Sequence, residues 1–84
     1  MAYILVIPER VQKEIDKIDS RYQPSIKIAL IGLRGDPFLG KKLSGKHKDE
    51  RSYEVWPYRI VYKIKKYELI ILIITVSHRQ GVYK

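Results

Sequence analysis

The sequence predicts an α+β fold in which an N-terminal strand and a helical hairpin pack on a mostly antiparallel four-stranded sheet. Three observations support this prediction. A short run of β-formers opens the chain at residues 3–7, and two segments with apolar residues at helical spacing follow within residues 9–35. Three further runs of β-formers fill residues 51–76. The order β-α-α-β-β-β places the helices on one face of a sheet, and 84 residues suffice for one domain, expected to span 1–84.

The helical hairpin is expected from its prolines, its glycine and its apolar spacing. Pro8 ends the first strand and suits the first turn of a helix, because proline has no amide hydrogen to donate. A helix over residues 9–20 carries apolar residues at i, i+4 and i+7, namely Val11, Ile15 and Ile18. Pro24 can open a second helix, and Gly35 with the following Asp36-Pro37 ends it. The stripe on the second helix is formed by Ile26, Leu30 and Leu33.

The sequence after the second helix predicts an irregular segment followed by three strands. Residues 38–50 are rich in glycine and lysine, so we expect a loop or a short turn of helix at 39–43. The first of the three strands covers 51–55, and Trp56-Pro57 bends or ends it. The second, at 58–64, alternates and so separates Arg59 and Lys63 from the apolar face. The third, at 68–76, has no polar alternation before Thr75, which is typical of a buried central strand.

The charge of the chain indicates a polyanionic partner. The formal net charge is +8, and residues 1–20 hold fewer basic than acidic side chains, so the whole surplus lies in residues 21–84. A surface of this kind attracts nucleic acid or another acidic partner. The alternative is that the lysines and arginines only keep a small protein in solution.

Composition argues against several other classes. The chain has no cysteine, and its two histidines and its carboxylates show no ligand spacing, so we expect no metal site. Its glycines do not form a nucleotide-binding pattern, and we expect no cofactor. The N-terminal run is too short for a signal peptide, and the longest uncharged run, residues 69–77, is too short to span a membrane. We therefore expect a cytoplasmic protein without a membrane partner.

The residues that could carry chemistry lie mostly in the last third of the chain. Arg59 is held by a strand and can grip a phosphate with two N–H groups; the alternative is an exposed arginine paired with Glu54. His78 and Arg79 stand where the third strand ends, and a histidine there can exchange protons near neutral pH. A solvated strand end is the alternative for this pair. Tyr83 could move a proton or stack on a base, or simply pack on its own domain.

A basic run precedes the strands and predicts a surface that follows a phosphate backbone. It comprises Lys41, Lys42, Lys46, Lys48 and Arg51, and it encloses His47, Asp49 and Glu50. The alternative is a solvated loop. Trp56 fits a plug at the edge of the core better than a platform for a base.

Taken together, these features resemble the RelE/ParE superfamily of toxins from bacterial and archaeal toxin–antitoxin systems. The resemblance covers nearly the whole chain, from the opening strand and the helical hairpin to the sheet. Its more specific pieces are Leu43-Ser44-Gly45, Pro57-Tyr58-Arg59-Ile60-Val61-Tyr62, and Val76-Ser77-His78-Arg79 with Val82-Tyr83.

The resemblance implies a function. RelE-like members are ribosome-dependent mRNA interferases, endoribonucleases that cut the codon in the A site without a metal. The RNA 2′-hydroxyl attacks the adjacent phosphodiester and leaves a 2′,3′-cyclic phosphate. By this resemblance Arg59 and Arg79 stabilise the phosphate, Tyr83 acts on the 2′-hydroxyl or stacks on a base, and His78 and Arg51 are further catalytic candidates. The RNA-binding candidates are Lys41, Lys42, Lys46, Lys48 and Lys63.

The resemblance also leaves two alternative functions open and implies a protein partner. Glu54 and Trp56 stand where relatives often have a basic residue and a glycine, and an acid there weakens phosphate binding. A ParE-type toxin that poisons DNA gyrase without cutting RNA, and a weakly active member that binds RNA or antitoxin, are the alternatives. In each case the family implies an acidic, RelB-like antitoxin that folds on the toxin, in a higher-order hetero-oligomer. If the chain is a RelE-type endoribonuclease, the ribosome and mRNA are its further partners.

Overall fold

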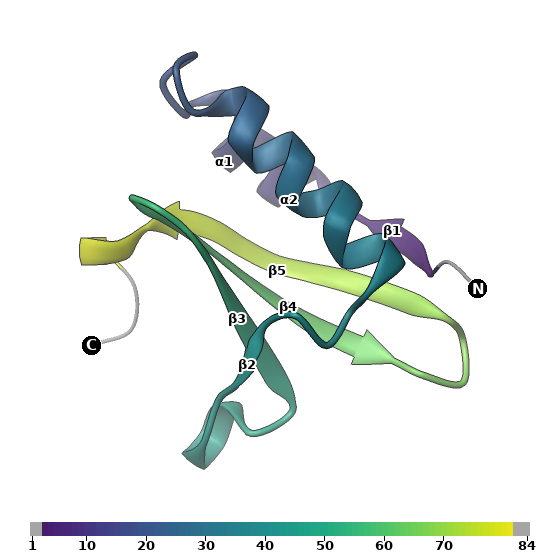
Figure 1. The fold of residues 1–84 in the computed structure, drawn as a ribbon. Coiled ribbons are helices and arrows are strands. Elements are labelled where there is room, and N and C mark those ends of the chain that lie inside the picture. The colour runs from purple at the N-terminus through teal and green to yellow at the C-terminus, as the bar shows by residue number, and fades with distance from the viewer. Residues whose placement is uncertain (1–2, 82–84) are drawn as a thin grey trace.

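A computed structural model describes residues 3–81 of the chain and confirms the α+β class. The sheet has five strands in the order β1-β5-β4-β3-β2 (Figure 1). Only β1 runs parallel to its neighbour β5, and the other three pairs are antiparallel. The elements are β1 Ile4–Val6, α1 Glu9–Asp16, α2 Gln23–Gly35, β2 Lys41–Lys42, β3 Glu50–Val55, β4 Tyr58–Lys65 and β5 Ile70–His78, with 3₁₀ turns η1 Gly45–His47 and η2 Arg79–Gly81.

The first helix is shorter than predicted. It starts after Pro8, as expected, but ends at Asp16 instead of continuing to residue 20. The side-chain Nε2 of Gln23, at the start of α2, donates to the main-chain oxygens of Ile15 (2.6 Å) and Ile18 (3.0 Å). These bonds add a donor to carbonyls at and just beyond the end of α1, where the helix pattern supplies fewer donors, so the chain can turn early into α2.

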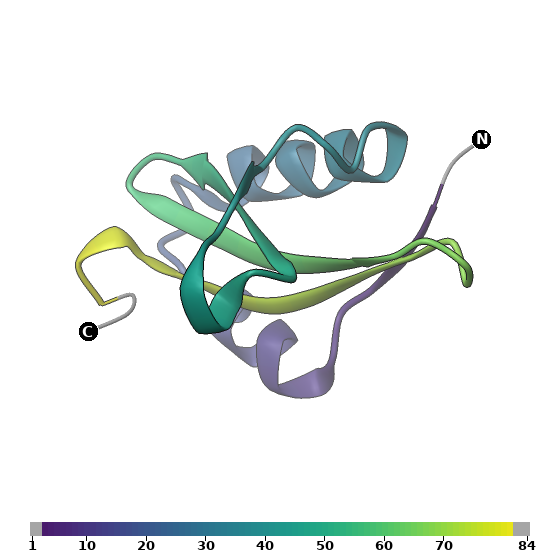
Figure 2. The same ribbon diagram turned by 90° about the horizontal axis from the view of Figure 1, so that it is seen from below.

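Helix α1 also protects one edge of the sheet. Strand β1 pairs with residues 70–72 of β5, which leaves the rest of that β5 edge open. Glu14 fills the gap by accepting from the amide of Val76 and the hydroxyl of Thr75, both at 3.1 Å, and Arg10 donates to the Ile74 oxygen at 2.9 Å. Figure 2 shows α1 beside β5 and α2 on the β4 side. Covering an edge in this way prevents unwanted strand pairing.

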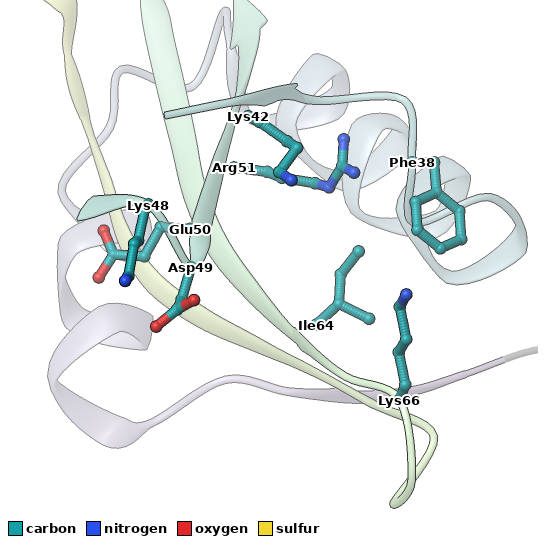
Figure 3. A pocket seen from close by; sticks show the side chains of 8 residues that line it. All are labelled: Phe38, Lys42, Lys48, Asp49, Glu50, Arg51, Ile64 and Lys66. Carbon is teal, nitrogen blue, oxygen red and sulfur yellow. The ribbon is translucent and has the colours of Figure 1, made fainter. Parts of the chain in front are cut away.

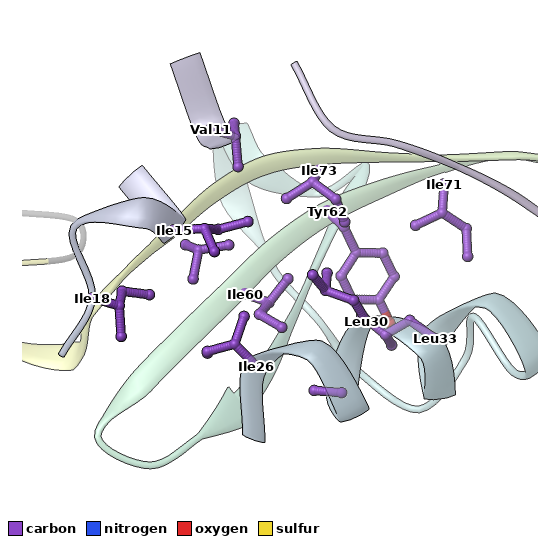
Figure 4. Packing of buried hydrophobic residues seen from close by; sticks show 12 residues of the cluster. Val11, Ile15, Ile18, Ile26, Leu30, Leu33, Ile60, Tyr62, Ile71 and Ile73 are labelled. Carbon is purple, nitrogen blue, oxygen red and sulfur yellow. The ribbon is translucent and has the colours of Figure 1, made fainter. Parts of the chain in front are cut away.

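Both helices lie on the same side of the sheet and bury one apolar cluster against it (Figures 1 and 4). The predicted helix stripes are confirmed, because Val11, Ile26 and Leu33 have no exposed surface. From the sheet the cluster receives Ile60, Tyr62, Ile71, Ile73 and Val76. We call this the helix side of the sheet and the opposite surface the open face.

The segment before β3 differs from the prediction and adds the fifth strand. Residues 39–43 contain no helix; Lys41–Lys42 form β2, which pairs with Ser52 and Arg51 of β3. The buried phenol of Tyr62 fixes the preceding loop, because its oxygen donates to Pro37 O (2.6 Å) and accepts from Gly40 N (2.9 Å). Burial raises the pKa of Tyr62, and the Gly40 amide partly opposes this shift.

Strand β5 begins and ends two residues later than predicted, so it includes His78. A bulge lies where Val61 pairs with Thr75 and Tyr62 pairs with Ile73, which leaves Ile74 without an opposite residue. The bulge lets Ile73 and Val76 both face the helices although they are three residues apart. The strand is not buried on both faces to the extent predicted for a central strand, because Leu72 and Ile74 remain partly exposed.

Candidate functional site

Arg59 lies on the open face of β4, between Glu54 of β3 and Ser77 of β5. Its Nη2 is 3.6 Å from Glu54 Oε2, so the ion pair that the alternative interpretation of Arg59 expected is present. The arginine side chain is 29% exposed and the glutamate 61%. Within residues 3–81 the Nε of Arg59 is buried and has no hydrogen-bond acceptor. A buried donor without a partner is uncommon in a purely structural contact, and guanidinium N–H groups have a geometry that suits the oxygens of a phosphate.

A groove with a volume of 430 Å³ leads from Arg59 to the β2 edge. Lys41 reaches it because β2 pairs Lys41 with Ser52, whose cross-strand partner Val61 shares the open face with Arg59. The groove therefore joins two cations with one carboxylate. Its lining consists of Leu39, Lys41, Leu43, Ser52, Tyr53, Glu54 and Arg59.

Arg79 lies at the same end of the sheet as Arg59. It follows β5 two residues after Ser77, the cross-strand partner of Arg59. Its amide donates to Pro57 O at 2.9 Å, and its guanidinium carbon is 4.3 Å from the ring centre of Trp56. Trp56 was predicted as a core plug, but 67% of it is exposed. The tryptophan instead holds Arg79 by a cation–π contact over the β3–β4 turn.

His78 does not join the two arginines. Strand alternation turns it to the helix side, opposite Tyr58. Its ring meets Tyr58 edge-on with centroids 5.6 Å apart, and Tyr58 makes a similar contact with Tyr22. Its Nδ1 accepts from the amide of Gln80 at 3.3 Å. His78, a predicted catalytic candidate, therefore lies on the opposite surface of the sheet from Arg59.

Arg51 is also on the helix side, because residues of β3 alternate and Arg51 pairs with the buried Tyr62. Its Nη1 donates to Gly40 O at 2.8 Å, and its guanidinium lies over the Phe38 ring at 5.1 Å. Arg51 thus belongs with Lys42 and Lys48, which line a second pocket next to it (Figure 3). Arg51, predicted as a further catalytic candidate, therefore lies on the opposite surface of the sheet from Arg59.

The remaining candidates are distributed over three places. Lys63 lies on the open face opposite Glu50, one row from the groove. Lys46 is exposed in the 3₁₀ turn η1. Tyr83 lies outside the residues that the structure describes. In the described range, 3–81, no three histidines or carboxylates gather to hold a metal, and no helix is long and apolar enough to cross a membrane.

Two residues that line the second pocket, Phe38 and Lys66, were not predicted from the sequence. Phe38 follows Asp36-Pro37 in a stretch without periodicity, and Lys66 lies in the turn between β4 and β5. Both line the pocket around Arg51, although they are far apart in the sequence. Only the single aromatic residue in a basic, irregular stretch could have drawn attention to Phe38.

Comparisons with known proteins agree with this architecture. A sequence model of the family described as the ParE toxin of the type II toxin–antitoxin system parDE matches residues 5–83. The isolated RelE toxin of E. coli is 28% identical, with 92% of this chain and 84% of that chain covered and a TM-score of 0.80. None of the curated proteins matches the chain significantly.

Two more distant structures share the fold. The RelBE2 toxin–antitoxin complex of Mycobacterium tuberculosis contains a chain that is 21% identical, with 94% of this chain and all of that chain covered and a TM-score of 0.86. The archaeal RelE–RelB complex from Pyrococcus horikoshii OT3 contains one that is also 21% identical, with a TM-score of 0.76. There, 98% of this chain and 100% of that chain are covered.

Proposed function

The chain belongs to the ParE toxin family of type II toxin–antitoxin systems, within the RelE/ParE superfamily, and we propose that this toxin is a ribosome-dependent endoribonuclease. The observation that carries the proposal is Arg59, with its unpaired Nε, at the same end of the sheet as Arg79. Two guanidinium groups supply the charge that a cleaved phosphodiester needs in its transition state. The 28% identity to the E. coli RelE toxin supports the same reading.

The proposed reaction is an internal transfer within the RNA. The 2′-oxygen forms a bond to the adjacent phosphorus while the bond from phosphorus to the 5′-oxygen breaks, giving a 2′,3′-cyclic phosphate and a 5′-hydroxyl. Arg59 and Arg79 stabilise the negative charge on the phosphorane. We assign the proton transfers to Tyr83, as the family resemblance implies, rather than to His78, because the His78 ring packs against Tyr58 on the helix side.

The proposed partners follow from charge and from the relatives. Solved structures of relatives contain the RelB antitoxin, in the E. coli complex and in the archaeal complex. An acidic, RelB-like antitoxin would complement the net charge of +8 and fold on this toxin in a higher-order hetero-oligomer. The ribosome would present the mRNA to the open face in the cytoplasm.

Primer extension on ribosome-bound mRNA tests the activity, using the purified toxin free of antitoxin. We expect cuts within the A-site codon from the unaltered protein and none from Arg79→Ala. Arg34→Ala removes an equal charge from the exposed end of α2 and should cut normally. Equal cutting by Arg79→Ala and the unaltered protein would refute the assigned role of Arg79.

Gyrase poisoning is the second candidate, and the family match to ParE toxins favours it. The open face of β3 also offers Glu50, Ser52 and Glu54, none of which can neutralise a phosphate. A folded toxin that leaves ribosome-bound mRNA intact but blocks DNA supercoiling by gyrase would establish this alternative.

A further inference from the structure

A second cationic pocket lies on the helix side of the sheet, on the opposite surface from Arg59. It is formed where the loop after α2, the β2–β3 region and the β4–β5 turn meet (Figure 3). Its volume is 180 Å³, below the roughly 300–1,000 Å³ of pockets for drug-sized ligands. Such a space suits a phosphate group or part of one nucleotide. The lining side chains are Phe38, Lys42, Lys48, Asp49, Glu50, Arg51, Ile64 and Lys66.

The charges of this pocket favour an anion. Four cationic residues share the lining with two acidic ones, and one of these, Glu50, alternates to the open face of β3 and has its carboxylate 3.2 Å from His47 Nδ1. Across residues 3–81, Lys42, Lys48 and Lys66 form no ion pair with a carboxylate. Their positive charge is therefore available to a ligand, and it is concentrated by the walls of the pocket.

Phe38 gives the pocket an aromatic surface beside the cations. Phe38 is 49% exposed, and the Arg51 guanidinium and the Lys66 ammonium lie 5.1 Å and 5.8 Å from the centre of its ring. Exposed rings beside lysine and arginine are how proteins hold single-stranded nucleic acids, because the ring stacks on a base while the cations contact the backbone. The loop that carries Phe38 is fixed by the Tyr62 bonds to Pro37 and Gly40, so ordering it on binding costs little.

Strand β2 connects this pocket to the groove at Arg59. It is the last strand of the sheet, so its outer edge has no neighbouring strand in the described chain. Its two residues point to opposite surfaces: Lys41 lines the groove on the open face, and Lys42 lines the pocket on the helix side. A phosphate backbone that crosses this edge meets a cation on both sides.

We propose that the pocket around Phe38 is a second RNA-binding site, which takes a phosphate and its base from a strand that passes over β2 away from Arg59. Lys42, Arg51 and Lys66 contact the phosphate, and Phe38 stacks on the base. The inference rests on the proposed RNA substrate and assigns the helix side a role in holding it. Arg51 and Lys42 thus act in binding, at a distance from the reacting bond.

The test is the salt dependence of RNA binding, followed by fluorescence anisotropy of a labelled 12-nucleotide single-stranded RNA. Lys42→Ala combined with Lys66→Ala should make the slope of log affinity against log salt shallower by up to about 0.7, since the pocket holds one phosphate and one lost phosphate contact removes about 0.7 for single strands. Lys13→Ala combined with Lys17→Ala removes equal charge from exposed positions at α1 and should leave the slope unchanged. Phe38→Leu should weaken binding roughly fivefold or more through lost stacking.

The outcomes separate this inference from the proposed function. If the Lys42/Lys66 variant and the Lys13/Lys17 variant change the slope equally, or if Phe38→Leu binds like the unaltered protein, the pocket is not an RNA site. Cleavage of ribosome-bound mRNA by the unaltered toxin would leave the proposed function intact in that case. Conversely, a pocket-dependent slope in a toxin that cuts no mRNA would support the pocket and overturn the nuclease.

Discussion

Replacing Tyr62 by phenylalanine tests how the fold holds its functional loop. The change removes one oxygen that makes two buried hydrogen bonds, at 2.6 Å to Pro37 O and 2.9 Å from Gly40 N. It leaves a buried carbonyl and a buried amide unpaired, and each unsatisfied group costs about 1–3 kcal/mol. Because the loop can relax partly toward water, we expect a loss of about 2–3 kcal/mol in the free energy of unfolding. For a domain of this size each kcal/mol lowers the Tm by about 4–8 °C.

Urea unfolding followed by circular dichroism measures this loss. The slope m of the free energy of unfolding against urea concentration should be the same for Tyr62→Phe and the unaltered protein, which shows that both unfold in the same transition. Tyr67→Phe is the matched control, because Tyr67 is fully exposed and the same oxygen is lost to solvent. The control should stay within about 0.5 kcal/mol of the unaltered protein. A loss below 0.5 kcal/mol in Tyr62→Phe would refute the claim that this phenol anchors the loop.

The same tyrosine predicts a pH dependence of stability. Its pKa in the folded chain is raised above the ordinary 10.0, chiefly by burial. Above pH 10 the unfolded chain therefore loses this proton more readily than the folded chain, and the stability from Tyr62 declines as pH rises. We expect the unaltered protein to lose more stability between pH 9 and 11 than Tyr62→Phe does. Parallel curves for the two proteins would contradict the assigned pKa direction.

Three further changes address the loop and the two arginines. Gly40→Ala puts a Cβ 2.5 Å from a buried phenol oxygen, so we expect destabilisation of about 1–3 kcal/mol in thermal unfolding. Trp56→Ala removes the cation–π contact with Arg79, which is worth about 0.5–1 kcal/mol at an exposed site. The rate of mRNA cleavage should therefore fall about two- to fivefold, and Trp56→Phe, which keeps an aromatic ring, should retain most of the original rate. Glu54→Gln removes the negative charge that competes with phosphate for Arg59. RNA affinity should rise up to about fivefold, since two charges at this separation interact by about 1 kcal/mol in water. Unchanged RNA affinity would contradict this competition.

Much of the fold could be predicted because periodicity determines it. The apolar stripe of α2, the β-rich run of β1 and the alternation in β4 each depend on neighbours within a few residues. The end of α1 could not, because it depends on Gln23, which bonds to carbonyls from the preceding segment. Strand β2 consists of two lysines and carries no apolar signal, so only its pairing with β3 reveals it.

The site was predicted in part for the same reason. Arg59 stands in an alternating strand, so its face followed from the sequence, and the pairing with Glu54 that was the alternative interpretation is present. Strand alternation also places Arg51 and His78 on the helix side, but this could not be predicted, because their faces depend on registers with β4 that a single sequence does not contain. Trp56 looked like a core residue from its size, whereas its surroundings in the structure are a turn and Arg79.

The measurement that tests the central claim most directly is cleavage of an mRNA that carries one 2′-deoxynucleotide at the mapped cut site. The proposed chemistry requires that 2′-oxygen as the nucleophile, so a ribosome-bound message with the single substitution should stay intact. The matched all-ribose message should be cut and should end in a 2′,3′-cyclic phosphate. Cutting of both messages at the same position would contradict internal attack, and with it the roles proposed for Arg59 and Arg79.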